Sequence, residues 1–160
     1  MKKKITIEYQ VLESAKELDY ADNELLNRAI KIADVAHSPY SQFNVGAAVR
    51  MDNGEILAAS NQENEAFPSG LCAERSVIFY AFSKYPDSFI TEIAIAAKHI
   101  GTLTAEPTRP CGACIQVMLD AEKRGKKPIK VILGSANQIE VISSIRDLLP
   151  FSFENLPLKK

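Results

Sequence analysis

The chain has 160 residues, of which 46% are apolar and 24% are charged, and its formal net charge is −1. This length suits one buried core, and the charge gives no electrostatic reason to expect a nucleic-acid partner. No apolar run approaches the roughly 18 residues of a membrane span, and the basic N-terminus lacks a signal-peptide core. We therefore expect one domain over residues 22–160 that binds neither nucleic acid nor membrane, with residues 1–21 as an extension packed on it.

The first two predicted elements are a short strand and a helix. Apolar side chains alternate over Ile5–Val11 as in a strand, after which charged residues dominate. From Asp22 the apolar spacing becomes helical. Asp22 or Asn23 is the expected N-cap, and the helix is expected to end before Pro39.

The rest of the chain alternates between predicted strands and helices. Strands are predicted at 45–51, 56–60, 90–98, 129–133 and 139–142, and helices at 72–84 and 110–123. A hairpin turn at Asp52–Glu55 joins the first two of these strands. This order predicts an α/β fold, a three-layer α/β/α sandwich around a mixed sheet of about five strands.

All three cysteines fall in two short motifs, Cys-Ala-Glu at 72–74 and Pro-Cys-x-x-Cys at 110–114. Cys111 and Cys114 lie one turn apart on a helix that Pro110 opens, and Cys72 begins the other helix. Free N–H groups and the dipole at a helix N-terminus favour anionic sulfur. Three thiolates suggest a catalytic zinc site, in which the fourth position is left to water and Glu74 serves as the nearby proton carrier.

Simpler interpretations exist for each part of this pattern. Taken alone, Cys72 fits a small buried hydrophobe, Glu74 fits a first-turn glutamate, and the Cys-x-x-Cys pair fits a redox dithiol. A closed structural zinc site needs a fourth ligand, and the only histidines, His37 and His99, lie near ends of elements. The open catalytic site accounts for the three cysteines and the glutamate together.

With these motifs the chain resembles the zinc-dependent cytidine deaminases of the small, homotetrameric, three-cysteine type. The deaminase signature is H-x-E followed by P-C-x-x-C, and a cysteine replaces the histidine in this type. The resemblance runs over about residues 22–153 and includes the segments 38–48, 61–64 and 148–153. It implies hydrolysis of cytidine and deoxycytidine to uridine and deoxyuridine plus ammonia in pyrimidine salvage. It also implies one Zn²⁺ per subunit, a cytoplasmic location, and a homotetramer, with a homodimer as the alternative.

The resemblance also implies roles around the metal. Glu74 is expected to take the proton of water and pass it to ring N3 and the leaving amine. Arg75 is expected to donate to cysteine sulfur and so offset the negative charge of three thiolates. The family usually has a second arginine after the last cysteine, where this chain has Ile115. Arg109 is a candidate substitute, although a solvated loop charge is the favoured interpretation for it.

Substrate recognition is expected at the end of the second strand of the hairpin. Asn61 and Glu63 share one side of the chain there, and the resemblance assigns them to the ribose. It assigns Phe43 to stacking on the pyrimidine ring and Phe153 to closing the pocket of a neighbouring subunit. Phe67 stands where the family often has tyrosine. Without the resemblance, the polar pair fits a solvated strand end and Phe43 fits the core.

Three alternatives remain open. A deaminase resembling blasticidin S deaminase shares both cysteine motifs but lacks the Asn-x-Glu pair. Deaminases of polynucleotides are disfavoured because no basic stripe accompanies the site. A noncatalytic zinc-stabilised binding module would need a fourth ligand and would give Glu74 no role. Residues 1–20 match no known role, and our interpretation is that they cover a subunit surface.

Overall fold

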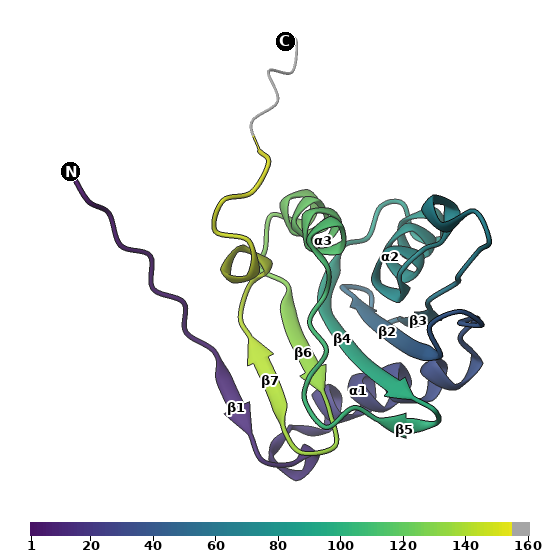
Figure 1. The fold of residues 1–160 in the computed structure, drawn as a ribbon. Helices are drawn as coiled ribbons and strands as arrows, with labels where there is room; N and C mark the ends of the chain where they lie inside the picture. Colours follow the sequence, from purple (N-terminus) through teal and green to yellow (C-terminus); the bar gives the residue numbers. More distant parts are fainter. Residues whose placement is uncertain (155–160) are drawn as a thin grey trace.

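The computed structural model describes residues 1–154, so residues 155–160 of the predicted domain lie outside the described part (Figure 1). Seven strands form one sheet, and three α-helices cover its two faces. The strands are β1 (Gln10–Leu12), β2 (Phe43–Met51), β3 (Ile56–Ser60), β4 (Ile90–His99), β5 (Thr102–Leu103), β6 (Lys130–Gly134) and β7 (Ile139–Ile142). The helices are α1 (Tyr20–Ile32), α2 (Ala73–Lys84) and α3 (Gly112–Gly125).

The sheet is mixed, and its strand order is β1-β7-β6-β4-β2-β3, with β5 paired to β4. Only β4 and β6 pair in parallel; every other pair is antiparallel. The predicted fold class is confirmed, but the sheet has seven strands where about five are predicted. The predicted Ile5–Val11 strand is reduced to β1, and β5 is a two-residue return after the turn at Ile100 and Gly101. Such short strands carry too few residues to show an alternating pattern.

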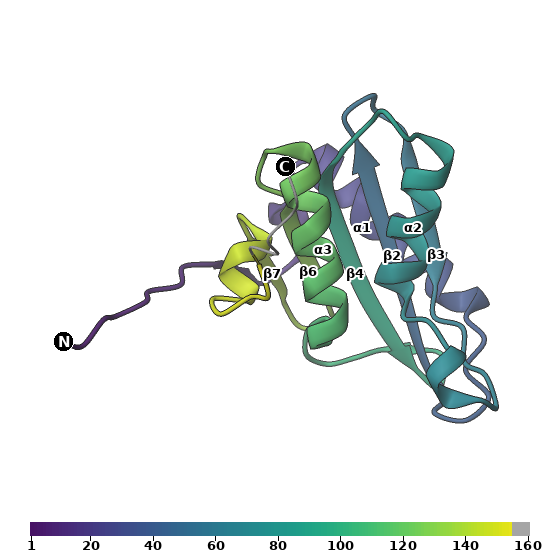
Figure 2. The same ribbon diagram turned by 90° about the horizontal axis from the view of Figure 1, so that it is seen from above.

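The helices are divided unequally between the faces of the sheet. α1 lies on one face, and α2 and α3 lie side by side on the other (Figure 2). Strand β4 shows why: its Ile93 and Ile95 point into the core under α2 and α3, whereas Ala94 and Ala96 face α1. Successive side chains of a strand point to opposite faces, so β4 offers large side chains to one layer and small ones to the other.

The N-cap of helix α1 lies three residues before Asp22, the first of its two predicted positions. Its N-cap is Asp19, whose side chain accepts a hydrogen bond from the Asp22 backbone N–H at 2.8 Å. The prediction of Asp22 or Asn23 as the cap is therefore wrong. Asp22 lies inside the first turn, buried, and its carboxylate pairs with the Lys130 ammonium of β6 at 2.5 Å. None of the helices in residues 1–154 is both long and apolar enough to cross a membrane.

The close approach of α1 to the sheet depends on one glycine. A Cβ placed on Gly46 of β2 would lie 2.0 Å from the Ala29 carbonyl oxygen and 2.8 Å from the Ala33 nitrogen. Both of these are backbone atoms, so no side chain can rotate to relieve the contact. Only glycine lets the strand and the helix backbone meet at this point.

We therefore expect Gly46→Ala to lower the free energy of unfolding by at least about 2 kcal/mol, because the added methyl group would force the backbones apart. Urea unfolding followed by circular dichroism measures this. Gly112→Ala is the matched control, since a Cβ there meets nothing within 4 Å. If the two variants unfolded at the same urea concentration, the close packing of α1 on β2 would be contradicted.

Candidate functional site

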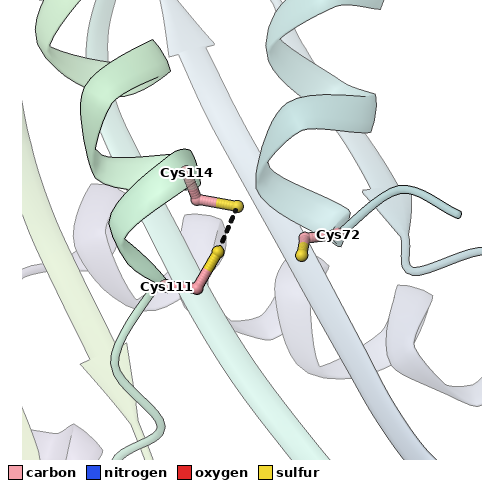
Figure 3. A group of neighbouring side chains, drawn as sticks. All are labelled: Cys72, Cys111 and Cys114. Carbon is pink, nitrogen blue, oxygen red and sulfur yellow. Dashed lines mark hydrogen bonds between the residues drawn. The ribbon is translucent and has the colours of Figure 1, made fainter. Parts of the chain in front are cut away.

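The three cysteines meet where α2 and α3 begin (Figure 3). Cys72 is the N-cap residue of α2, Cys111 is the N-cap residue of α3, and Cys114 lies in the first turn of α3. The three Sγ atoms lie within 4.8 Å of one another, and those of Cys111 and Cys114 are 3.5 Å apart. The structure thus brings together sulfurs that lie 39 residues apart along the chain, as the predicted zinc site requires.

The donor set fits zinc. Tetrahedral Zn²⁺ holds thiolates at about 2.3 Å, which places the sulfurs about 4 Å apart, close to the spacing found here. Among the residues that the structure describes, no fourth His, Cys, Asp or Glu side chain joins the group. His37 and His99 are both outside it. Three protein ligands are the pattern of an open, catalytic zinc site rather than of a closed structural one.

Electrostatics at the cluster favour anionic sulfur on Cys72. A hydrogen bond from the Cys114 thiol and the guanidinium of Arg75 lower the pKa of Cys72 to about 5. The Nη2 of Arg75 lies 3.8 Å from the Cys72 sulfur. Donation to Cys72 and burial raise the pKa of Cys114 in turn. One thiolate is thus ready without metal, and binding of a cation would remove the protons of the remaining thiols.

Arg109 does not serve as a second cation for the sulfurs. Its guanidinium pairs with the carboxylate of Glu140, which is buried in β7. The prediction of a substitute charge at the metal is therefore wrong, whereas the favoured prediction of a solvated loop charge is confirmed, since the Arg109 side chain is 59% exposed and lies in the loop before α3. Ile115 packs its side chain against the core under α2 and α3. In the described part of the chain, Arg75 is the only arginine with a hydrogen bond to cysteine sulfur.

Glu74 lies in the first turn of α2, beside the cysteines. Its side chain is buried, with 4% of the residue exposed. Burial raises the pKa of this carboxyl, and the charge of Cys72 adds to the effect. A raised pKa brings a carboxyl closer to the range in which it can both accept and release a proton.

A cleft leads away from the cysteines toward the end of β3. Its lining includes Cys72, Arg75, Asn61 and Glu63. Tyr40 and Phe67 also line it, and their rings lie edge to face with 5.5 Å between centroids. Tyr40 has no role predicted from the sequence, since a single aromatic residue in a loop has no spacing signal. The cleft therefore combines apolar surface and two aromatic rings with a small number of polar side chains.

Glu63 binds the loop that precedes β2. Its carboxylate accepts hydrogen bonds from the Tyr40 N–H at 2.9 Å, the Ser41 N–H at 3.3 Å and the Ser41 hydroxyl at 2.5 Å. The Ser41 hydroxyl is the largest cause that lowers the pKa of Glu63, followed by the Tyr40 N–H. Glu63 is therefore an ionised hydrogen-bond acceptor at the cleft. Ser41 is a residue that sequence reasoning missed, because its role arises from a contact across 22 residues.

The amide of Asn61 is engaged with the backbone of β2. Its Oδ1 accepts from the Val45 N–H at 2.7 Å, and its Nδ2 donates to the Phe43 carbonyl at 2.9 Å. An asparagine amide has two N–H donors, so one remains for a ligand. Asn61 thus fixes the start of β2 and still presents a donor to the cleft it lines.

Two predicted substrate residues are not at the cleft in this single chain. Phe43, at the start of β2, lines a separate hollow with His99 and Leu103. Phe153 is 70% exposed, and its backbone exchanges two hydrogen bonds with the side chain of Gln116 in α3. Their assignments to ring stacking and to a neighbouring subunit stay predictions.

Comparison with known proteins agrees with this geometry. The chain is 35% identical to the cytidine deaminase of Halalkalibacterium halodurans over 129 residues, which is 81% of this chain and 91% of that protein. It is 38% identical to the cytidine deaminase of Sporosarcina psychrophila over 130 residues, 81% of this chain and 89% of that protein. The crystal structure of cytidine deaminase from Burkholderia pseudomallei matches with a TM-score of 0.67 and 31% identity, covering 81% of this chain and 97% of that one.

The family model described as the cytidine and deoxycytidylate deaminase zinc-binding region matches residues 19–127, well over half of the chain. This match spans all three cysteines, Glu74 and Arg75. The sequence, the three-cysteine cluster and the fold agree, and the chain belongs to the cytidine and deoxycytidylate deaminase family.

Proposed function

We propose that this protein hydrolyses cytidine and deoxycytidine to uridine and deoxyuridine with release of ammonia. The observation that carries the proposal is the meeting of three thiols at two helix N-termini, with the buried Glu74 beside them and a cleft leading outward. Relatives that match over most of their length carry the name cytidine deaminase. Pyrimidine salvage is the corresponding role.

In the proposed reaction, Cys72, Cys111 and Cys114 would hold one Zn²⁺ per subunit. When bound, zinc supplies a Lewis acid that lets water act as a nucleophile near neutral pH. Glu74 accepts one proton from this water and passes it to ring N3, while the water oxygen bonds to C4 of the pyrimidine. Glu74 then takes the second proton from that oxygen and gives it to the amine, which leaves as ammonia when the C4–N bond breaks. Its burial beside the cysteines supports this role, because a desolvated carboxylate is a stronger base.

Glu63 and Asn61 are proposed to bind the sugar. Glu63 is an ionised acceptor suited to a ribose hydroxyl, and Asn61 has one N–H donor that its backbone contacts leave free. A site with such groups discriminates against ligands that lack the matching hydroxyls, because buried polar groups would then stay unpaired. Phe43 is proposed to stack on the pyrimidine ring.

The proposal includes a homotetramer, with a homodimer as the alternative, in which Phe153 closes the pocket of a neighbouring subunit. The exposure of the Phe153 ring supports a contact outside its own chain. A cytoplasmic location is proposed because all three cysteines are free thiols, which a reducing compartment preserves.

Glu74→Gln should lower kcat for cytidine by at least about a hundredfold, because glutamine has the shape of the acid but cannot move a proton. Zinc content by elemental analysis should stay at one per subunit. Glu65→Gln is the matched control, since Glu65 is exposed and lies outside the cleft. Retained turnover in Glu74→Gln with zinc bound would remove Glu74 from the mechanism.

Arg75→Gln should weaken zinc retention and lower kcat/KM by about tenfold or more, because Arg75 is the only arginine bonded to cysteine sulfur in the described residues. Competition with a chromogenic chelator measures zinc retention independently of turnover. Arg28→Gln, at an exposed position on α1, controls for loss of a positive charge. A loss of less than a few-fold in both quantities would show that the helix dipoles suffice.

Purified protein should release ammonia from cytidine and deoxycytidine but not from cytosine, with loss of absorbance near the cytidine band. Glu63→Gln should raise KM for cytidine by about tenfold or more, since the ionised acceptor for a sugar hydroxyl is lost. Activity on blasticidin S alone would favour the alternative of a deaminase resembling blasticidin S deaminase. No activity on any of these substrates with zinc bound would favour the alternative of a noncatalytic zinc-stabilised binding module.

A further inference from the structure

The first nine residues form an arm that the family match and the proposed catalytic site leave unexplained. The family match begins at residue 19. Residues 1–9 have no helix or strand, and in both ribbon views they lead away from the body of the protein (Figures 1 and 2). The arm continues directly into β1, the edge strand of the sheet. The arm thus extends β1, a three-residue edge strand that pairs with β7 along one side and, in the part of the chain that the structure describes, has no neighbouring strand along the other.

The arm has the side-chain pattern of a strand with one apolar face. Four large apolar side chains alternate along the arm and the start of β1, and all are exposed by 43% or more: Ile5, Ile7, Tyr9 and Val11. In β1 the register pairs Val11 with Glu140 of β7 and Leu12 with Ile139. Leu12 packs into the core under α1, so Val11 points to the opposite face, the face that α2 and α3 cover. If the arm continues β1, its apolar side chains all lie on that second face.

The arm is complementary to itself in one antiparallel register. A two-fold axis at Thr6 places Ile5 opposite Ile7, Lys4 opposite Glu8, and Lys3 opposite Tyr9 of the second copy. The apolar side chains then share one face of the ribbon with Lys3, and the two Lys4–Glu8 pairs lie on the other face. Cross-strand pairs of this kind stabilise antiparallel strands, whereas like charges directly opposite destabilise them. Shifting the axis to Glu8 would pair Ile5 with Val11 and Ile7 with Tyr9 but would set two glutamates directly opposite each other, so charge complementarity is what favours the Thr6 register.

We propose that residues 1–11 of two copies of this chain pair as antiparallel strands about Thr6, and so join the β1 edges of two sheets. An exposed edge strand has unpaired N–H and C=O groups that can bond to another chain. A contact between identical surfaces is self-complementary under two-fold symmetry, which is the pattern that this arm shows. The pairing uses no residue of the cleft or of the cysteine cluster, so it stands independently of the proposed function.

A zero-length crosslink between Lys4 and Glu8 tests the pairing directly. A carbodiimide joins an amine to a carboxylate only when they touch, and the two residues lie too far apart in one extended arm. Equal amounts of ¹⁴N- and ¹⁵N-labelled full-length protein, mixed and crosslinked, should yield Lys4–Glu8 peptides of mixed isotope content in mass spectrometry. Absence of such mixed peptides in folded protein at concentrations where copies associate would overturn the proposal.

Charge reversal gives a second measurement with a built-in rescue. Lys4→Glu alone and Glu8→Lys alone each place like charges opposite each other twice, so each should weaken arm pairing by about tenfold in sedimentation equilibrium. A mixture of the two variants restores opposite charges at both positions and should associate as the unchanged protein does. Lys16→Glu is the control, because Lys16 is exposed and lies outside the arm.

These variants leave the cleft intact, so zinc content and ammonia release per subunit should be unchanged. Circular dichroism checks that each variant is folded. If the single variants associated as strongly as the unchanged protein, or if the mixture showed no recovery, the Thr6 register would be wrong. If the crosslinks joined Lys4 to some other acidic surface of a second copy, the arm would bind elsewhere and the proposal would fail. If the unchanged protein showed no deaminase activity, only the proposed function would be contradicted, and the arm pairing would not be affected.

Discussion

The site depends on one topological constraint: two helices must begin at the same end of the same sheet face. Strands β3 and β4 are both antiparallel to β2, so they run in the same direction as each other. Strands β4 and β6 pair in parallel and therefore also share this direction. Helix α2 connects the first of these pairs, and α3 connects the second. Both helices therefore start beyond the carboxyl ends of parallel-running strands, which is where α/β sheets form their ligand sites. The cysteines are adjacent because of this strand order.

The same arrangement supplies much of the electrostatics. A helix N-terminus has free N–H groups and a partial positive charge, and two of them face the sulfurs here. Ile115 packs against the core and Arg109 is bound to Glu140, so within residues 1–154 Arg75 is the only arginine that bonds to the thiols. The chain thus gains apolar packing from Ile115 at the position where the resemblance predicts a second arginine. As a result, one arginine and two helix ends share the stabilisation of the sulfurs.

The sequence predicted the parts of this structure that depend on local pattern. The cysteine spacing placed all three ligand candidates at helix starts, and apolar periodicity found the three helices and the five longer strands. Prediction from the sequence failed where a residue acts through contacts with residues far away along the chain. Asp19 rather than Asp22 caps α1, because Asp22 is drawn inward to Lys130 of β6. The pairing of Arg109 with Glu140 and of Glu63 with Ser41 likewise joins positions 31 and 22 residues apart, which no local pattern reveals.

Glu63 and Asn61 show how side chains proposed to bind a ligand can also hold their own site in shape. A carboxylate has about four acceptor positions, and Glu63 uses three of them on Tyr40 and Ser41. One position is left, which suits one sugar hydroxyl in the proposed reaction. Asn61 is in the same situation, with its amide bound to β2 and one N–H unused. Because both side chains are already fixed by the backbone, a nucleoside would meet an ordered site, and little of its binding energy would be lost in arranging these groups.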